Sequence, residues 1–173
     1  MARIPPLSIV ICAAALLSAC TSSKDILEPS ALLGTGELIR SGTTTILDME
    51  TVHYTESAFQ AIKESGIRAI SGKVMMDHGT EVPLALQEDT DRSLQESVDL
   101  LEKWNGAANG RIQYAFCPRF VVSCTERLLV GVRDLSAQYG VRVHTHASEN
   151  REEIAIVEAE RGMRNVVYLD HIG

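Results

Sequence analysis

The feature that most constrains the fold of this chain is a regular alternation of strand-like and helix-like segments along its sequence. Strands are expected over residues 43–48, 67–76, 111–117, 141–146 and 166–170, where β-branched residues cluster. Helices are expected over residues 31–40, 55–65, 89–104 and 150–162, and from the cap at 123–126 to Tyr139. An alternation of this kind implies parallel strands joined by crossover helices.

Two architectures satisfy this pattern, an open doubly wound sheet and a closed (β/α)₈ barrel. No strand is followed by G-x-G-x-x-G or G-x-x-x-x-G-K-[ST], so the usual nucleotide-binding fingerprints are excluded. Polar residues instead recur at the carboxyl ends of the strands: Asp48, Glu50, Asp77, His78, Arg119, His146, Glu149 and His171. A barrel builds its active site from several strand ends in this way. A partial (β/α)₈ TIM barrel is therefore favoured, although only five strands are expected.

Composition narrows the function further. The chain has 173 residues, 45% of them hydrophobic, which fits one folded globular domain. Its net charge is −7, and no basic patch with interleaved aromatic residues occurs, so nucleic acid is excluded as a partner. The four cysteines form no C-x-x-C pair, and Cys117 and Cys124 are expected to be buried, uncharged side chains.

The motif with the clearest chemistry is His144-Thr145-His146-Ala147-Ser148-Glu149 at the end of an apolar strand. The strand period of two directs His144 and His146 to the same side, and Glu149 follows just past the strand. Imidazoles and a carboxylate at a strand end are the components of a metal site that activates water. The alternative is a pair of hydrogen-bonded histidines, because H-x-H is a short and common pattern.

The N-terminus is treated separately from the fold. Residues 1–20 contain Arg3, an apolar run and then Leu17-Ser18-Ala19-Cys20, as in a secretory signal. These last four residues also resemble a bacterial lipobox, in which Cys20 would be lipidated. The apolar run is shorter than the roughly 20 residues of a membrane-spanning helix. We expect a signal or lipobox segment at 1–20, a linker at 21–26 and a barrel domain at 27–173; an accidental apolar leader is the alternative.

Three segments together resemble the amidohydrolase superfamily, over about residues 27–173. They are Ser41-Gly42-Thr43-Thr44-Thr45, the segment from Cys117-Pro118-Arg119-Phe120 to Ser123-Cys124, and the segment from His144 to Asn150. The most similar branch contains guanine deaminase, methylthioadenosine/S-adenosylhomocysteine deaminase and chlorotriazine hydrolases. Each motif alone is weak, whereas the ordered set is fairly specific.

The resemblance implies a (β/α)₈ barrel covered from its second to its sixth strand. It implies one divalent metal ion, zinc or else iron, with His146 as a ligand. Glu149 would carry a proton between water and the leaving group, and His171, after the sixth strand, would contact the hydrolytic water or the substrate. Arg119 and Phe120 would bind the heterocycle. For Arg119 the alternative is a surface salt bridge.

The chemistry implied is hydrolytic deamination or dehalogenation of a small heterocycle. A divalent metal lowers the pKa of bound water from about 16 towards 7. Glu149 would accept the proton and deliver it to the leaving amine, a role worth roughly 10²–10⁴-fold in rate. Guanine, an adenosine derivative and a triazine all fit this chemistry. Among the other polar residues, we expect His144 to have a packing or supporting role, His53 and His78 to be loop histidines, and Asp170 to lie in a strand-end loop.

The sequence departs from the family pattern in two parts of the metal shell. The H-x-H pair of the first strand and the aspartate of the eighth have no counterpart here, whereas zinc usually takes about three protein ligands. We therefore expect this chain alone to be inactive, to bind metal weakly and to be poorly soluble, with two unpaired sheet edges. Two functions remain. One is a fragment of a cytoplasmic amidohydrolase whose full-length form can be a homo-oligomer. The other is an inactive barrel remnant, exported and lipid-anchored if the lipobox is genuine.

Overall fold

The computed structural model describes residues 24–79 and 82–173. The expected signal segment, Cys20 and residues 21–23 of the expected linker lie outside these residues. No helix in the described part of the chain is long and apolar enough to cross a membrane.

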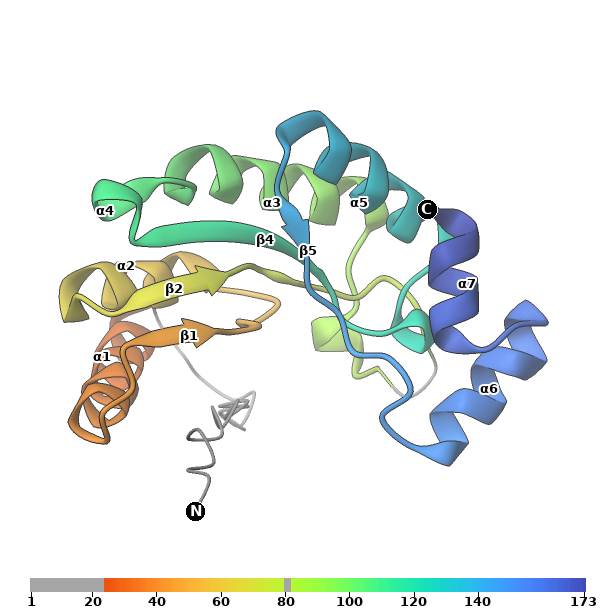
Figure 1. Ribbon diagram of the computed structural model, residues 1–173, viewed down its shortest axis with the longest axis horizontal. Helices are drawn as coiled ribbons and strands as arrows, with labels where there is room; N and C mark the ends of the chain where they lie inside the picture. The colour runs from red at the N-terminus through yellow and green to blue at the C-terminus, as the bar shows by residue number, and fades with distance from the viewer. Residues whose placement is uncertain (1–23, 80–81) are drawn as a thin grey trace, which may run out of the picture.

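All strand pairs of the sheet are parallel, as the sequence predicts (Figure 1). The strands are β1 (Thr45–Leu47), β2 (Arg68–Ser71), β3 (Val74–Met75), β4 (Ile112–Pro118) and β5 (Arg142–Val143). β2 and β3 pair with successive parts of β4, so they form one interrupted row; β1 pairs with β2, and β5 pairs with β4. The rows therefore follow one another in chain order. This is the order of a barrel segment, because a doubly wound sheet reverses its strand order at a switch point.

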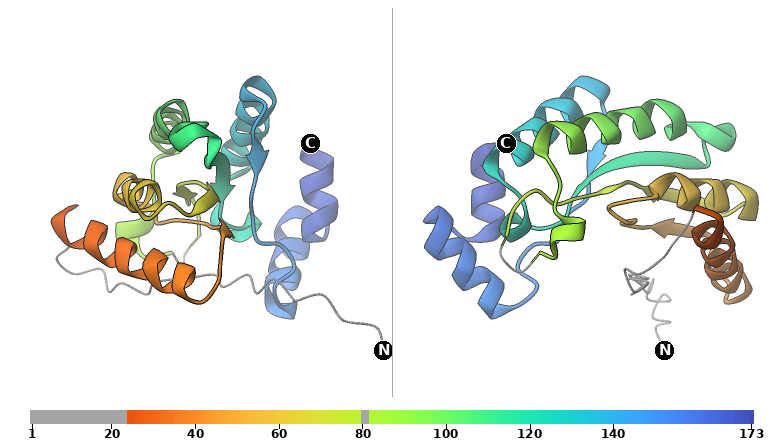
Figure 2. Two further views of the ribbon diagram at one scale, coloured as in Figure 1. Left: turned by 60° about the vertical axis from the view of Figure 1, so that its left-hand side comes forward. Right: turned by 180° about the vertical axis from the view of Figure 1, so that it is seen from behind.

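Helices connect the rows and lie largely where the hydrophobic spacing predicts them. They are α1 (Lys24–Arg40), α2 (Thr55–Ser65), α3 (Thr90–Trp104), α4 (Ala107–Gly110), α5 (Glu126–Tyr139), α6 (Arg151–Arg161) and α7 (Asn165–Ile172), with short 3₁₀ turns η1 (Leu84–Leu86) and η2 (Val121–Ser123). Because α1 begins at Lys24, residues 24–26 are helical, and the expected linker is wrong there. α3 and α5 run along β4, while α6 and α7 lie at the opposite end of the molecule from α1 and α2 (Figure 1, Figure 2).

Side-chain caps explain where three of these helices begin. The carboxylate of Asp89 accepts a hydrogen bond from the backbone N–H of Arg92 at the start of α3. The hydroxyl of Thr125 does the same for Leu128 in α5. At the start of α6 the side-chain amide oxygen of Asn150 accepts a hydrogen bond from the backbone N–H of Glu153, the third residue of the helix. Each cap satisfies a backbone donor that has no partner within the helix.

The expected strand over residues 166–170 is wrong, because this segment is the helix α7. Asn165 and Tyr168 are buried three residues apart, whereas Val166 and Val167 are 61% and 56% exposed. That spacing is helical, since a strand would bury alternate residues. The structure therefore contains no sixth strand within the described residues, and Asp170 lies in a helix rather than in a strand-end loop.

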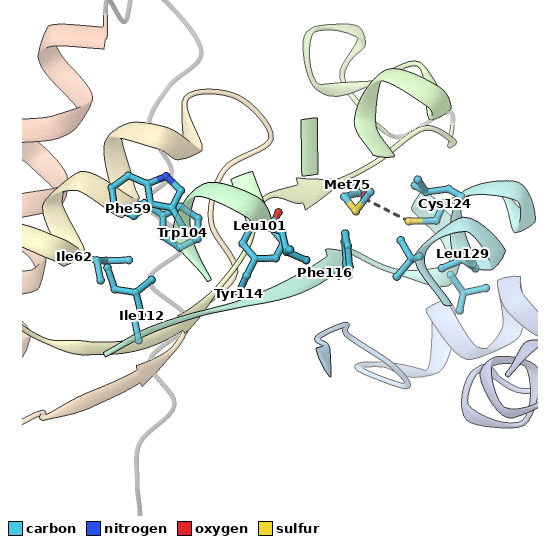
Figure 3. Packing of buried hydrophobic residues seen from close by; sticks show 14 of the residues in the cluster. Phe59, Ile62, Met75, Leu101, Trp104, Ile112, Tyr114, Phe116, Cys124 and Leu129 are labelled. Atoms are coloured by element: carbon cyan, nitrogen blue, oxygen red, sulfur yellow. Dashed lines mark hydrogen bonds between the residues drawn. The ribbon is translucent and has the colours of Figure 1, made fainter. Parts of the chain in front are cut away.

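The hydrophobic core lies between the sheet and its helices, along β4 (Figure 3). Ile112, Tyr114 and Phe116 alternate along β4 and are all buried on the helix side. Phe59 of α2 stacks on Trp104 of α3 with ring centroids 5.4 Å apart. Aromatic contacts of this kind stabilise a core beyond the area that they bury. The core thus fixes β4, the strand whose carboxyl end leads to the candidate site.

A buried ion pair joins the sheet to the segment that precedes α3. Lys73, between β2 and β3, contacts Glu88 through its ammonium group, and both side chains are 5% exposed or less. Ser93 donates a hydrogen bond to the same carboxylate over 2.9 Å. Such a pair is tolerated in a core only when its remaining hydrogen bonds are also made.

Candidate functional site

Several of the residues expected at the strand ends, among them Asp77, Arg119 and His146, lie at the edge of the sheet where β3, β4 and β5 end. The backbone N–H of Arg119, just after β4, donates to Met75 of β3 over 3.2 Å. Past β5, the N–H of His146 donates to the carbonyl of Arg119 over 3.0 Å. The backbone hydrogen bonds between neighbouring segments therefore continue beyond the regular strands. They bring Arg119, Phe120 and His146 together, as the parallel topology predicts.

The imidazole of His146 is held in one orientation. Its Nδ1 lies 3.0 Å from the carbonyl oxygen of Arg119. A carbonyl can only accept, so Nδ1 carries the proton and Nε2 of the neutral ring keeps its lone pair. A histidine that donates from one ring nitrogen in this way presents the other to a metal ion. The ring nitrogen of His146 that is left to accept a bond is therefore Nε2.

Phe120 packs directly on this imidazole. The two rings are stacked with centroids 4.5 Å apart and an interplanar angle of 17°. The guanidinium of Arg119 lies 5.1 Å from the centroid of the Phe120 ring, within range of a cation–π interaction. Arg119 is exposed. Nη1 of Arg119 also donates to Sδ of Met76 over 3.5 Å. Phe120 therefore packs on His146, and Arg119 is the more exposed of the two neighbouring side chains.

Glu149 lies on the turn between β5 and α6, and its side chain is exposed. The turn includes Ser148 with a φ of 59°, in the left-handed region that L-residues rarely adopt. The backbone N–H of Glu149 donates to the carboxylate of Glu153 over 2.6 Å. The backbone of the turn is therefore anchored, and the Glu149 side chain is left accessible three residues after His146.

Asp77, just after β3, connects this edge to two helices. Its carboxylate accepts hydrogen bonds from the backbone N–H of Thr125 over 2.7 Å and from the hydroxyls of Thr125 and Thr90 over 2.6 Å each. Asp77 is buried at 9% exposure. These contacts make it a structural anchor between the starts of α3 and α5.

Two acidic residues after β1 form a second titratable group. Burial, the negative charge of Asp48 and a hydrogen bond to the Asp48 carboxyl together raise the pKa of Glu50 well above its usual value. The Glu50 carboxyl group therefore keeps its proton to a higher pH than an ordinary glutamate does. The pairing has no signal in the sequence beyond the i, i+2 spacing of Asp48 and Glu50.

His144 is half-buried, and its ring centroid lies 6.5 Å from that of His146. Burial lowers the pKa of His144, the neighbouring imidazole of His146 adds to this effect, and the backbone and charge of Asp48 oppose it. Its Nδ1 is buried without a hydrogen-bond partner. A neutral imidazole in this environment fits the expected packing role.

The remaining expected histidines are dispersed. His53 hydrogen-bonds through Nε2 to the carbonyl of Ala85 over 2.8 Å, and the His78 side chain is exposed. His171 is exposed in the last turn of α7. Because His171 lies within a helix and not after a sixth strand, the expectation that it contacts the hydrolytic water loses its structural basis.

The side chains that could bind a metal ion are spread over several elements. Among residues 24–79 and 82–173, no three His, Cys, Asp or Glu side chains are gathered closely enough to hold one. His146 fits as a single ligand because of the orientation of its ring. The described residues therefore fit part of a metal site.

The sequence of the chain is similar to those of known hydrolases. A model of the amidohydrolase family matches residues 9–171. The 5'-deoxyadenosine deaminase of Methanobrevibacter smithii is 40% identical over 143 residues, which cover 83% of this chain and 31% of the relative. The chain thus spans about a third of the length of the curated relatives that it matches.

Solved structures give the same result for the fold. Escherichia coli guanine deaminase superposes with a TM-score of 0.81 at 31% identity, covering 87% of this chain and 36% of that one. The atrazine chlorohydrolase TrzN from Arthrobacter aurescens TC1, complexed with zinc, superposes with a TM-score of 0.80 at 22% identity over the same shares of the two chains. The second similarity concerns the fold alone.

Proposed function

This chain belongs to the amidohydrolase family, and we propose that it carries the His146–Glu149 part of a site that hydrolytically deaminates a purine-like heterocycle. The observation that carries the proposal is the arrangement of these two residues. The His146 ring presents Nε2 because Nδ1 donates to Arg119, and an accessible carboxylate follows on the next turn. The deaminase names of the similar proteins support the reaction type.

We assign His146 as one ligand of a divalent metal ion, with zinc as the candidate. A bound metal of this kind supplies polarised water that loses a proton near neutral pH. Glu149 is close enough along the chain to serve the same position, and its exposed carboxylate can accept that proton. The same carboxyl group then donates the proton to the departing nitrogen, so that ammonia leaves as a neutral molecule.

Arg119 is assigned to substrate recognition. Its exposed guanidinium at the strand end can donate to a ring nitrogen or to an exocyclic oxygen of a flat heterocycle. The sequence also predicts Phe120 to stack on the substrate. Because His146 already covers a face of the Phe120 ring, we assign Phe120 chiefly to holding the imidazole.

The test is a graft of this segment into a complete relative. Residues 43–161 would replace the aligned segment of E. coli guanine deaminase, and ammonia release would be measured with guanine and 5'-deoxyadenosine. We expect a folded graft that deaminates at least one of the two and loses this activity in H146A. A folded, zinc-loaded graft without activity would contradict the proposal and favour an inactive barrel remnant.

A further inference from the structure

We propose that Glu153 is a positioning residue that holds the Glu149 turn in its working conformation. This inference rests on the proposed role of Glu149. Glu153 is the third residue of α6, and it is buried at 6% exposure. A buried carboxylate needs hydrogen-bond donors around it, and here the donors come from the turn itself.

Both carboxylate oxygens of Glu153 accept from the backbone that leads to α6. Oε2 accepts from the N–H of Glu149 over 2.6 Å, and Oε1 accepts from the N–H of Ser148 over 3.3 Å. In an ordinary capping box, the side chain at this helical position reaches the N-cap residue. Here it reaches the two residues before the N-cap, Asn150, and so fixes the segment that carries Glu149.

The conformation of the turn requires such a hold. Ser148 has a φ of 59°, which is unfavourable for a residue with a Cβ. With the φ of Ser148 positive, the N–H groups of both Ser148 and Glu149 bond to Glu153. The two carboxylate oxygens of Glu153 therefore stabilise the positive φ of Ser148. Without these hydrogen bonds, Ser148 would return to a more favourable backbone conformation.

A second contact fixes Glu153 from the other side. Asn165, the first residue of α7, is fully buried and donates through Nδ2 to Oε1 of Glu153 over 2.5 Å. The Glu153 carboxylate thus joins the turn, the start of α6 and the start of α7. A proton carrier must keep its position through the reaction. Glu153 restrains Glu149 by accepting a hydrogen bond from its backbone N–H, and the Glu149 side chain stays exposed.

The test compares three variants of the full chain by backbone amide hydrogen exchange and by NMR chemical shifts. E153Q keeps the size of the side chain but replaces one acceptor oxygen with an NH₂ donor. N150A removes the α6 cap and leaves the bonds from Glu153 to the turn. E152Q alters the exposed neighbouring carboxylate and serves as the matched charge control.

We expect exchange at the amides of Ser148 and Glu149 to become about tenfold faster in E153Q, since hydrogen bonds to a charged acceptor are the strong ones. The Glu149 amide proton should also lose the downfield shift that a carboxylate acceptor produces. N150A and E152Q should leave both observables within about twofold of the parent chain. Exchange at the Phe116 amide in β4 reports whether a variant has lost global stability.

Unchanged exchange and shifts at both amides in E153Q would overturn the proposal, as would an equal effect in N150A. These readouts need neither metal nor turnover, so they separate this inference from the proposed function. Protection that depends on Glu153 in a zinc-loaded graft without deaminase activity would sustain the positioning of the turn and contradict the proposed chemistry.

Discussion

The carbonyl oxygen of Arg119 accepts two hydrogen bonds from His146, one from its backbone N–H and one from its ring Nδ1, each over 3.0 Å. One peptide group thereby fixes both the position of the residue and the tautomer of its side chain. The Phe120 ring stacks on one face of the imidazole. The orientation of the candidate ligand thus depends on the residues that end β4 rather than on β5 itself, which is short.

The first prediction concerns Phe120. In the guanine deaminase graft, F120A should lower zinc affinity about tenfold, because residues that orient a metal ligand typically contribute 10–100-fold. F120Y, which keeps the aromatic ring, should bind zinc like the parent graft. Competition with a chromophoric chelator measures both. Equal affinities for F120A and the parent graft would show that the stacking does not orient His146.

The second prediction concerns Asp77. D77N replaces a carboxylate oxygen with an NH₂ group that faces the donors of Thr125 and Thr90. We expect the free energy of unfolding to fall by about 2–3 kcal/mol, the cost of leaving buried donors without acceptors. Urea denaturation measures this loss, and H78N at the exposed neighbouring position is the control. A loss equal to that of H78N would mean that Asp77 does not anchor α3 and α5.

The third prediction concerns the buried thiols. Burial raises the pKa of Cys117, and burial raises the pKa of Cys124 to about 12. The unfolded thiols have a pKa of about 8.5. Above this value the unfolded state binds fewer protons than the folded state, so the free energy of unfolding falls as pH rises towards 12. Below about pH 8 the thiols make no such difference.

Two measurements check this in a C12S/C20S background, which removes the thiols outside the described residues. Ellman's reagent at pH 8 should react with Cys117 and Cys124 only after urea unfolds the chain. The urea midpoint should also be lower at pH 10 than at pH 8, and this drop should shrink in a variant with C117A and C124A. Rapid modification of either thiol in the folded chain would contradict the burial.

The fourth prediction concerns Gly72, between β2 and β3. A Cβ at this position would overlap the carbonyl oxygen of Ala115 in β4 and would lie 3.0 Å from Sγ of Cys117. G72A should therefore separate the two rows and destabilise the chain by roughly 2–4 kcal/mol, within the range for strained core substitutions. G36A is the control, because a Cβ there meets nothing within 4 Å. Thermal unfolding compares the two, and equal midpoints would contradict the close approach of the rows.

The sequence predicts those elements whose side-chain pattern fits only one type of secondary structure. The helix over residues 55–65 is confirmed with the same bounds, because Gly66 ends it with a φ of 82°. Residues 166–170 are ambiguous, since a short apolar run fits a buried strand or a helix equally well. The burial of Asn165 and Tyr168 decides between the two, and that burial depends on tertiary contacts with α6.

The candidate site is predictable in part for the same reason. Parallel topology brings Arg119 and His146 to one edge of the sheet, and the structure confirms this. The anchoring of the turn by Glu153 was missed, although Asn150 and Glu153 show the N-cap and N3 spacing of a capping box. The raised pKa of Glu50 depends chiefly on burial, which the sequence pattern does not specify.

The central assignment for this site is Glu149 as the proton carrier. The deciding measurement is the kcat for ammonia release by the zinc-loaded guanine deaminase graft, compared with the same graft carrying E149Q or, as a matched control, E152Q. We predict that E149Q lowers kcat by about 10²–10⁴-fold, the usual contribution of a general acid–base group, while E152Q stays within about twofold. An E149Q graft that binds zinc normally and keeps the parent kcat would contradict the account.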